Sequence, residues 1–160
     1  MSFLPLLPLP DAAHATAVPA CLVPASALTP VCPRPLYGQR ISAGFPSPAE
    51  EYLEKGLDLN QYLVRNKTAT FYFRVQGDSM VGARIFDGDM VVVDRSLTSK
   101  HRSIVLAVVN ADYTIKRLHK RAGVIELRAE NPRYAPIQFG DGETLEIWGV
   151  VVGVVCRFDA

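Results

Sequence analysis

Proline is concentrated at one end of this chain, and this feature most limits what the chain can fold into. Eight of its 12 prolines lie within residues 1–43, where the only charged residues are Asp11, Arg34 and Arg40. Proline lacks a backbone N–H donor and fixes φ, so closely spaced prolines favour irregular or polyproline II structure over helix and sheet. We therefore expect a flexible N-terminal arm over residues 1–43 and a folded domain over residues 44–160.

The folded part carries balanced charge, with 15 basic and 15 acidic residues after position 43. Neutralising nucleic-acid phosphates takes an excess of Lys and Arg on one face, so we expect no autonomous DNA binding. The apolar run from Ile147 to Cys156 is shorter than the about 20 residues that cross a bilayer. Pro5, Pro8 and Pro10 interrupt the apolar N-terminus, which argues against a signal peptide. We expect no contact with a membrane.

The cysteines agree with a cytoplasmic location. Cys21, Cys32 and Cys156 are odd in number and have no Cys-x-x-Cys spacing. Such a set is typical of reduced thiols, because disulfide frameworks pair their cysteines in oxidising compartments. We therefore expect free thiols in a cytoplasmic protein.

A short helical or extended segment over residues 44–69 is expected to lead into the core. Ser47 and Glu50 have the spacing of a capping box, and Pro48 suits the first helical position. These signals predict a helix over residues 48–55 that ends at Gly56. Asp58 can cap a further turn through residue 63.

Beyond residue 68, short runs of β-branched, aromatic and apolar residues alternate with turn signals. Strands are predicted over residues 70–75, 90–93, 104–109, 113–120, 124–128 and 145–158. Their hairpin-like spacing, with no helical pattern between them, predicts a mainly β, antiparallel-rich domain, either a half-barrel or a sandwich.

Common catalytic and metal-binding signatures are missing from the sequence. It has no phosphate-binding P-loop, no dinucleotide-binding glycine motif and no His-Glu-x-x-His. His14, His101 and His119 are too scattered to indicate a metal site. Asp87 and Asp89 flank Gly88 and are interpreted as turn formers. We expect neither a metal nor a cofactor.

Ser79 stands out because it follows a predicted strand and a glycine-aspartate pair. At such a turn a serine can act as a nucleophile beside backbone N–H groups, or it can simply cap the turn. With no well-placed histidine, the remaining base is a desolvated lysine. Lys116 shares one face of a predicted strand with Thr114 and Leu118, where it can be buried or can extend to water. From these residues alone both alternatives stay open.

Several motifs together resemble the self-cleaving LexA/UmuD family. They are Gly77-Asp78-Ser79-Met80, Phe86-Asp87-Gly88-Asp89, Thr114-Ile115-Lys116-Arg117-Leu118, which places the lysine 37 residues after the serine, and Glu146-Ile147-Trp148-Gly149-Val150-Val151. The resemblance implies a signal-peptidase-like β domain. It also implies that Ser79 is the nucleophile, that Lys116 is the general base, and that the backbone N–H groups of Ser79 and Met80 form the oxyanion hole.

The N-terminal side is similar to the UmuD branch of this family. Only 43 residues precede the match, where LexA-type repressors carry a winged helix-turn-helix. The segment from Ala43 to Tyr52 is similar to the UmuD cleavage region, with Gly44 lying 35 residues before Ser79. The resemblance therefore implies self-cleavage between Ala43 and Gly44.

The same resemblance implies a role in the SOS response to DNA damage. A RecA filament on single-stranded DNA is expected to stimulate the cut. The shortened chain, Gly44 to Ala160, is expected to form a homodimer and to serve as an accessory subunit of a UmuC-type Y-family translesion polymerase. A LexA-like repressor fragment, a signal-peptidase-like enzyme and a non-enzymatic polymerase-binding module with a vestigial dyad are the alternatives.

Overall fold

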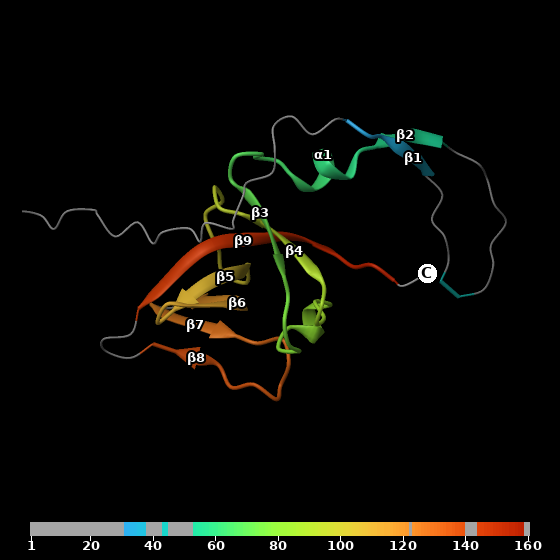
Figure 1. Ribbon diagram of the computed structural model, residues 1–160. Coiled ribbons are helices and arrows are strands. Elements are labelled where there is room, and N and C mark those ends of the chain that lie inside the picture. The colour runs from blue at the N-terminus through green and yellow to red at the C-terminus, as the bar shows by residue number, and fades with distance from the viewer. Residues whose placement is uncertain (1–30, 38–42, 45–52, 122, 140–143, 159–160) are drawn as a thin grey trace, which may run out of the picture.

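The computed structural model describes residues 31–37, 43–44, 53–121, 123–139 and 144–158 (Figure 1). These residues form a two-stranded sheet and a seven-stranded sheet, with one short α-helix and one 3₁₀ turn. The elements are β1 (Arg34–Tyr37), β2 (Leu53–Leu57), α1 (Leu59–Leu63), β3 (Thr70–Arg74), the 3₁₀ turn (Val81–Ala83), β4 (Met90–Asp94), β5 (Ile104–Val109), β6 (Asp112–Arg121), β7 (Val124–Arg128), β8 (Ile137–Gln138) and β9 (Leu145–Val155).

The seven-stranded sheet has the strand order β3-β4-β9-β5-β6-β7-β8, and every neighbouring pair is antiparallel. This confirms the prediction of a mainly β, antiparallel-rich fold. The strands predicted over residues 104–109 and 124–128 coincide with β5 and β7. The last strand ends at Val155, earlier than predicted. β8 was not predicted, because its two residues are defined only by pairing with β7.

β9 is an interior strand of the sheet and joins the β3-β4 pair to the strands β5 to β8 (Figure 1). Val152 of β9 has no partner in the pairing with β4, and Trp148 has none in the pairing with β5, so each pairing contains a bulge. Such bulges bend a strand and increase its twist. β9 can therefore pair with β4 near its C-terminal end and with β5 near its N-terminal end.

The core is built around Trp148, which is 1% exposed. Phe71 and Phe73 meet its ring edge-on, with centroid separations of 5.0 and 5.3 Å. The next residue in the chain, Gly149, has to be a glycine, because a Cβ there would lie 2.6 Å from Val93 Cγ1. A second cluster on the other side of β9 consists of Val105, Ala107, Leu118 and Leu127. Packing within these two clusters holds in place the strands that carry the candidate site.

The segment before the sheet differs from the sequence prediction. Leu53 to Lys55, expected at the end of a helix, lie in β2 and pair with β1, with Leu36 opposite Glu54. Pairing with a distant strand therefore overrides the local helical signal. The predicted cap at Ser47 lies outside the described residues.

The proline-rich arm also contains one strand that was not expected. β1 falls within residues 1–43, for which the sequence indicated no regular structure. Residues 1–30 and 38–42 lie outside the described residues. We call β1 and β2 together the ribbon; it flanks Ala43 and Gly44 on both sides in the chain.

The predicted turn after the ribbon is present as α1. Asp58 is its N-cap, and its carboxylate accepts from the backbone N–H groups of Asn60 and Gln61 at 2.8 and 3.1 Å. The other carboxylate oxygen accepts from Cys32 N–H at 2.6 Å. One side chain thus caps the helix and connects it to Cys32, two residues before β1. Among the described helices, none is long and apolar enough to cross a bilayer.

Candidate active site

Ser79 lies on a turn between β3 and the 3₁₀ turn. Hydrogen bonds to Asp87 and Asp89 hold the start of this turn. Val75 N–H donates to the Asp89 carbonyl at 2.8 Å, and Gly77 N–H donates to the Asp87 carboxylate at 2.6 Å. Gly77 has φ +93°, a conformation that side chains disfavour. Asp87 and Asp89 act as turn formers, because the Asp89 carboxylate also accepts from Phe86 N–H at 2.8 Å. The chain therefore leaves the sheet through a well-defined turn before the half-buried Ser79.

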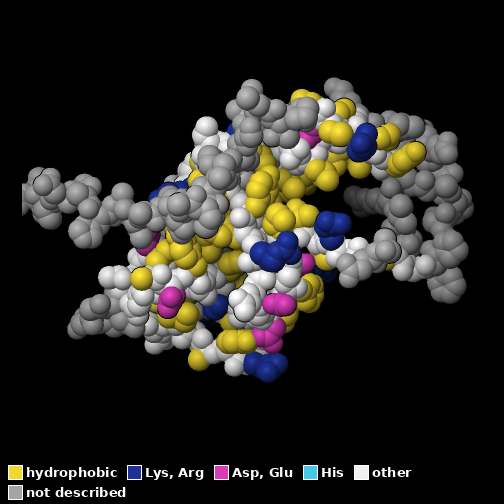
Figure 2. Space-filling model, in the orientation of Figure 1, with side chains coloured by type: hydrophobic (Ala, Val, Ile, Leu, Met, Phe, Trp, Pro, Cys, Tyr) yellow, Lys and Arg dark blue, Asp and Glu magenta, His cyan; other side chains and the backbone are white. Residues whose placement is uncertain are grey.

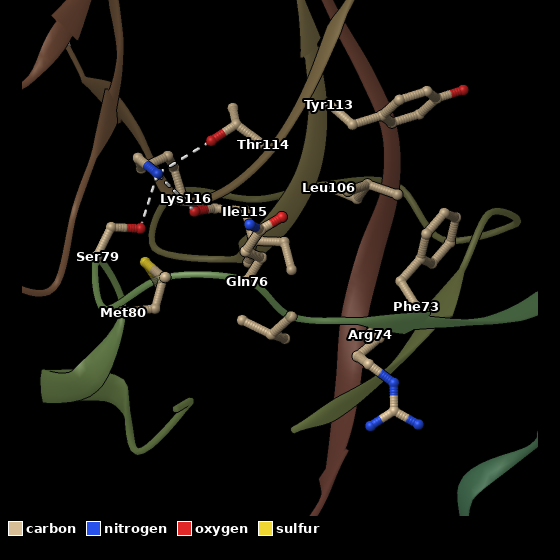
Figure 3. Close-up of a pocket in the computed structure, with 12 residues that line it drawn as sticks. Phe73, Arg74, Gln76, Ser79, Met80, Leu106, Tyr113, Thr114, Ile115 and Lys116 are labelled. Atoms are coloured by element: carbon tan, nitrogen blue, oxygen red, sulfur yellow. Dashed lines mark hydrogen bonds between the residues drawn. The ribbon is translucent and has the colours of Figure 1, made fainter. Parts of the chain in front are cut away.

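Lys116 reaches this serine from β6. Its Nζ lies 2.9 Å from Ser79 Oγ, 3.0 Å from Thr114 Oγ1 and 3.0 Å from the Ile115 carbonyl oxygen (Figure 3). The lysine is 9% exposed, so it does not extend to water. As the strand period predicts, Leu118 is buried on the same strand. The structure brings together the serine and the lysine that the sequence singled out.

The electrostatics of this pair favour an uncharged amine. Burial lowers the pKa of the Lys116 ammonium below its ordinary value of 10.5. A neutral amine has two N–H donors and one lone pair. The donors match the oxygens of Thr114 and Ile115, and the lone pair is then left to accept the Ser79 hydroxyl proton. This arrangement can activate a serine for nucleophilic attack.

The backbone N–H groups of Ser79 and Met80 were expected to stabilise an oxyanion. Among the described residues, neither group donates a hydrogen bond to another residue. The Met80 side chain is 2% exposed and packs in the core, which fixes the backbone at this point. Free N–H groups beside a nucleophile are what charge stabilisation at a carbonyl requires.

The dyad lies in an open cleft of about 370 Å³. Its walls come from β3, β5, β6 and the Ser79 turn, as Figure 3 shows. Away from Ser79 and Lys116 the walls are mixed, with the apolar side chains of Phe73 and Leu106 beside the polar side chains of Arg74 and Gln76.

The expected cleavage site lies elsewhere in the structure. Ala43 and Gly44 are exposed, and neither residue lines the cleft. In Figure 1 their short teal segment lies apart from the large sheet. The structure therefore does not bring the expected scissile bond to the dyad.

Two features of the site could be traced only partly from the sequence. Thr114 was placed on the face of Lys116, but its contact with Nζ was not anticipated. The segment Glu130–Tyr134, which contacts the Ser79 turn, was noted only for its Asn131-Pro132-Arg133 turn signal. Its distance from Ser79 along the chain leaves no local signal for this contact.

The other candidate residues lie away from the dyad. The rings of His101 and His119 are 4.8 Å apart, so the fold brings together two histidines that the sequence separates. Within the described ranges, no group of three or more His, Cys, Asp or Glu side chains could hold a metal ion. Cys32 and Cys156 are free, exposed thiols, and Cys21 lies outside the described residues.

The charged side chains form no single basic surface on the visible face. Figure 2 shows separate groups of Lys and Arg with acidic and hydrophobic side chains between them. This distribution agrees with the balanced charge of the sequence.

The sequence of this chain matches a known protein family and several known proteins. A family model described as Peptidase S24-like matches residues 35–152. Protein MucA of Salmonella typhimurium is 49% identical over 119 residues, which are 73% of this chain and 80% of that protein. Protein ImpA of Salmonella typhimurium is 40% identical over 125 residues, covering 78% of this chain and 84% of its own length. LexA repressor 2 of Geobacter sulfurreducens is 39% identical over 133 residues, covering 82% of this chain and 64% of the repressor.

Proposed function

We propose, from the premise that this chain belongs to the Peptidase S24-like family, that it is a UmuD-like serine endopeptidase that cleaves its own chain. Membership in this family confirms the resemblance to LexA and UmuD proteins. The observation that carries the proposal is the 2.9 Å contact between Lys116 Nζ and Ser79 Oγ in an open cleft. The nucleophile is Ser79, and the general base is Lys116.

The reaction begins when neutral Lys116 takes the hydroxyl proton of Ser79. The serine oxygen attacks the Ala43 carbonyl carbon, and the backbone N–H groups of Ser79 and Met80 stabilise the resulting oxyanion. The C–N bond then breaks, and Lys116 returns its proton to the departing amine of Gly44. Water, deprotonated by Lys116, hydrolyses the acyl-enzyme and leaves a carboxylate on Ala43.

Delivery of the scissile bond is a separate requirement. Ala43 and Gly44 do not line the cleft, so the arm has to move before Ser79 can attack. In this proposal a RecA filament on single-stranded DNA increases the fraction of molecules, or of paired protomers, in which the bond occupies the cleft. Because the substrate is already tethered, raising this fraction raises the rate in proportion.

The product of the cut is the polypeptide Gly44 to Ala160. We propose that it forms a homodimer and acts in the cytoplasm as an accessory subunit of a UmuC-type Y-family polymerase during SOS mutagenesis. The similarity to MucA and ImpA supports this role, since both are UmuD-like. In this scheme residues 1–43 are a removable arm, and residues 44–160 form the functional domain.

A transcriptional repressor is the second candidate, and the similarity to a LexA repressor favours it. The two candidates differ in DNA binding. A gel-shift experiment with duplex DNA and no RecA should show no sequence-specific complex for the UmuD-like function. A salt-resistant, sequence-specific shift would favour the repressor.

The cleavage assay tests the enzyme assignment directly. Ser79→Ala and Lys116→Ala should both remain folded and give no fragment beginning at Gly44 after incubation with RecA, ATP and single-stranded DNA. Intact-mass spectrometry identifies the fragment. Ser99→Ala and Lys100→Ala are matched controls outside the cleft and should cleave like the unmodified chain. A Gly44 fragment from either dyad variant contradicts the assignment, and an uncut unmodified chain points to a binding module with a vestigial dyad.

The pH dependence tests the lysine base. Burial lowers the pKa of Lys116, so the neutral fraction increases as pH rises toward a midpoint below 10.5. RecA-independent cleavage should therefore accelerate from neutral to alkaline pH. The rate is measured from the fragment yield at fixed ionic strength, and a rate that does not change between pH 7 and 10 counts against a lysine base.

A further inference from the structure

The segment Glu130–Tyr134, which we call the strap, lies between β7 and β8 and contacts the turn that carries Ser79. Glu130 N–H donates to the Ser79 carbonyl at 2.9 Å, and Gly82 N–H donates to the Glu130 carbonyl at 2.7 Å. These two bonds bind the strap to the nucleophile turn on both sides of Met80. The contact is close, because a Cβ on Gly82 would lie 2.4 Å from the Glu130 carbonyl oxygen.

Three strap side chains converge on Asp78, the residue before the nucleophile. Asn131 Nδ2 donates to the Asp78 carbonyl at 3.0 Å and to its carboxylate at 3.3 Å. Arg133 Nη1 lies 3.3 Å from the carboxylate, and the Tyr134 hydroxyl donates to its other oxygen. Asn131 is 7% exposed, so its amide depends on these partners. Within the described residues, the side chains that hydrogen-bond to the carboxylate of Asp78 all belong to the strap.

The strap is also connected to β6, the strand that carries Lys116. Arg117 follows Lys116 on β6 and points to the opposite face, where its Nε donates to the Glu130 carboxylate. Arg117 Nη1 donates to the Arg102 carbonyl at 2.7 Å, which holds the guanidinium in place. Glu130 therefore links β6, which carries Lys116, to the turn that carries Ser79, and this link lies outside the cleft.

This arrangement controls where the carboxylate of Asp78, the residue before Ser79, lies. The residues that line the cleft include Gly77 and Ser79 but not Asp78. Besides Lys116, the charged or titratable side chains of the cleft are Arg74 and Tyr113. A carboxylate within about 4–6 Å of the amine would favour the ammonium form and disable the base. The contacts with the strap keep this carboxylate outside.

We propose that the strap is a positioning element that sets the Ser79 turn against Lys116 and holds the Asp78 carboxylate out of the cleft. The proposal rests on the proposed function, because positioning is defined here by the self-cleavage reaction. Asn131, Arg133, Tyr134 and Glu130 are positioning residues, since they act through Asp78 and the turn.

The first test compares pH profiles of RecA-independent self-cleavage. Arg133→Ala combined with Tyr134→Phe removes two of the three side chains that hold the Asp78 carboxylate, while Asn131 keeps its contacts with the Asp78 carbonyl and with one carboxylate oxygen. Cleavage at pH 8 should fall about tenfold or more, and the midpoint of the pH profile should rise by about one pH unit. Asp78→Asn in the same background should return the midpoint to that of the unmodified chain. Asp78→Asn alone should leave the midpoint unchanged.

The outcomes separate positioning from simple stability. A lower rate with an unchanged midpoint, or no rescue by Asp78→Asn, overturns the role assigned to the Asp78 charge. An unaltered rate and midpoint overturn the whole proposal. Tyr134→Phe alone removes one hydroxyl and serves if the double variant does not fold, and it should move the midpoint in the same direction. If the unmodified chain does not cleave, or if Ser79→Ala does, the proposed function has failed instead.

The second test reverses the ion pair between β6 and the strap. Arg117→Glu and Glu130→Arg each place like charges together and should lower the cleavage rate about tenfold or more. The double reversal should restore most of that loss. Arg121→Glu, on the same strand but away from the strap, is the matched charge control and should cleave normally. Absence of recovery in the double variant contradicts the proposed link.

Discussion

The ribbon and the seven-stranded sheet are both antiparallel, yet they are stabilised in different ways. Every residue of β1 is exposed, whereas four of the five residues of β4 are buried. An isolated two-stranded ribbon is marginal in water, whereas a large sheet with a core is cooperative. The dyad lies in the well-packed region, and the expected cleavage site lies beside the marginal one. A self-cleaving chain benefits from this difference, because its catalytic groups need fixed geometry and its substrate segment needs to move.

The largest expected difference is in the effect of removing an aromatic side chain from each region. Trp148→Ala should lower the free energy of unfolding by about 3–5 kcal/mol, because it empties the centre of the core. Tyr37→Ala, on exposed β1, should change it by less than about 0.5 kcal/mol. Urea denaturation followed by circular dichroism measures both values. Similar losses for the two variants would show that the ribbon belongs to the cooperative core.

A smaller effect is expected at the dyad itself. Lys116→Met should raise the free energy of unfolding at pH 7 by roughly 0.5–2 kcal/mol, because it replaces a buried amine with an apolar side chain of similar length. Burial lowers the pKa of Lys116 in the folded chain, so above that pKa and below 10.5 the unfolded chain binds more protons. The unmodified chain therefore gains stability across this window as pH rises, and the advantage of Lys116→Met shrinks.

Thermal and urea unfolding of the unmodified chain and of Lys116→Met at several pH values measure this change in relative stability. Lys100→Met, at an exposed lysine, is the control and should show no such pH dependence. A Lys116→Met variant that is less stable than the unmodified chain at neutral pH would show that the hydrogen bonds of Nζ outweigh its burial.

The smallest global effect is expected from Asp58, which ties the ribbon to α1. Asp58→Ala should increase hydrogen exchange at Cys32 and along β1 while leaving the protection of β4 unchanged. The pKa of Asp58 is lowered, first by the backbone N–H of Cys32, so this contribution is present above pH 3.8 and disappears as pH falls through the lower folded value. Exchange followed by mass spectrometry resolves the two regions.

Asp112→Ala, an exposed carboxylate at the start of β6, provides the comparison for this experiment. It should leave exchange in β1 unaltered. Equal exchange in β1 for Asp58→Ala and the unmodified chain would mean that strand pairing alone holds the ribbon.

Local sequence by itself determined several elements of this protein. The apolar run over residues 104–109 and the turn-bounded run over residues 124–128 became β5 and β7. Asp58 was identified as a cap and is one. Ser79 and Lys116 were singled out from motif and spacing, and they lie in contact. The strands and the cap were readable because strand period, turn residues and capping depend on neighbours along the chain, whereas the pairing of Ser79 with Lys116 came from the resemblance to the LexA/UmuD family.

Other features were decided only by the tertiary structure. Residues 53–55 carried a helical signal but pair with β1, and β9 lies between β4 and β5 although it comes last in sequence. Burial of Lys116 and the contacts of Asp78 with a strap residue 56 positions away depend on side chains that only folding brings together. The sequence, through its resemblance to a known family, could name the serine and the lysine that we propose as nucleophile and base. Their distance, the lowered pKa of Lys116 and the position of the Asp78 carboxylate follow from packing between strands, which no local pattern encodes.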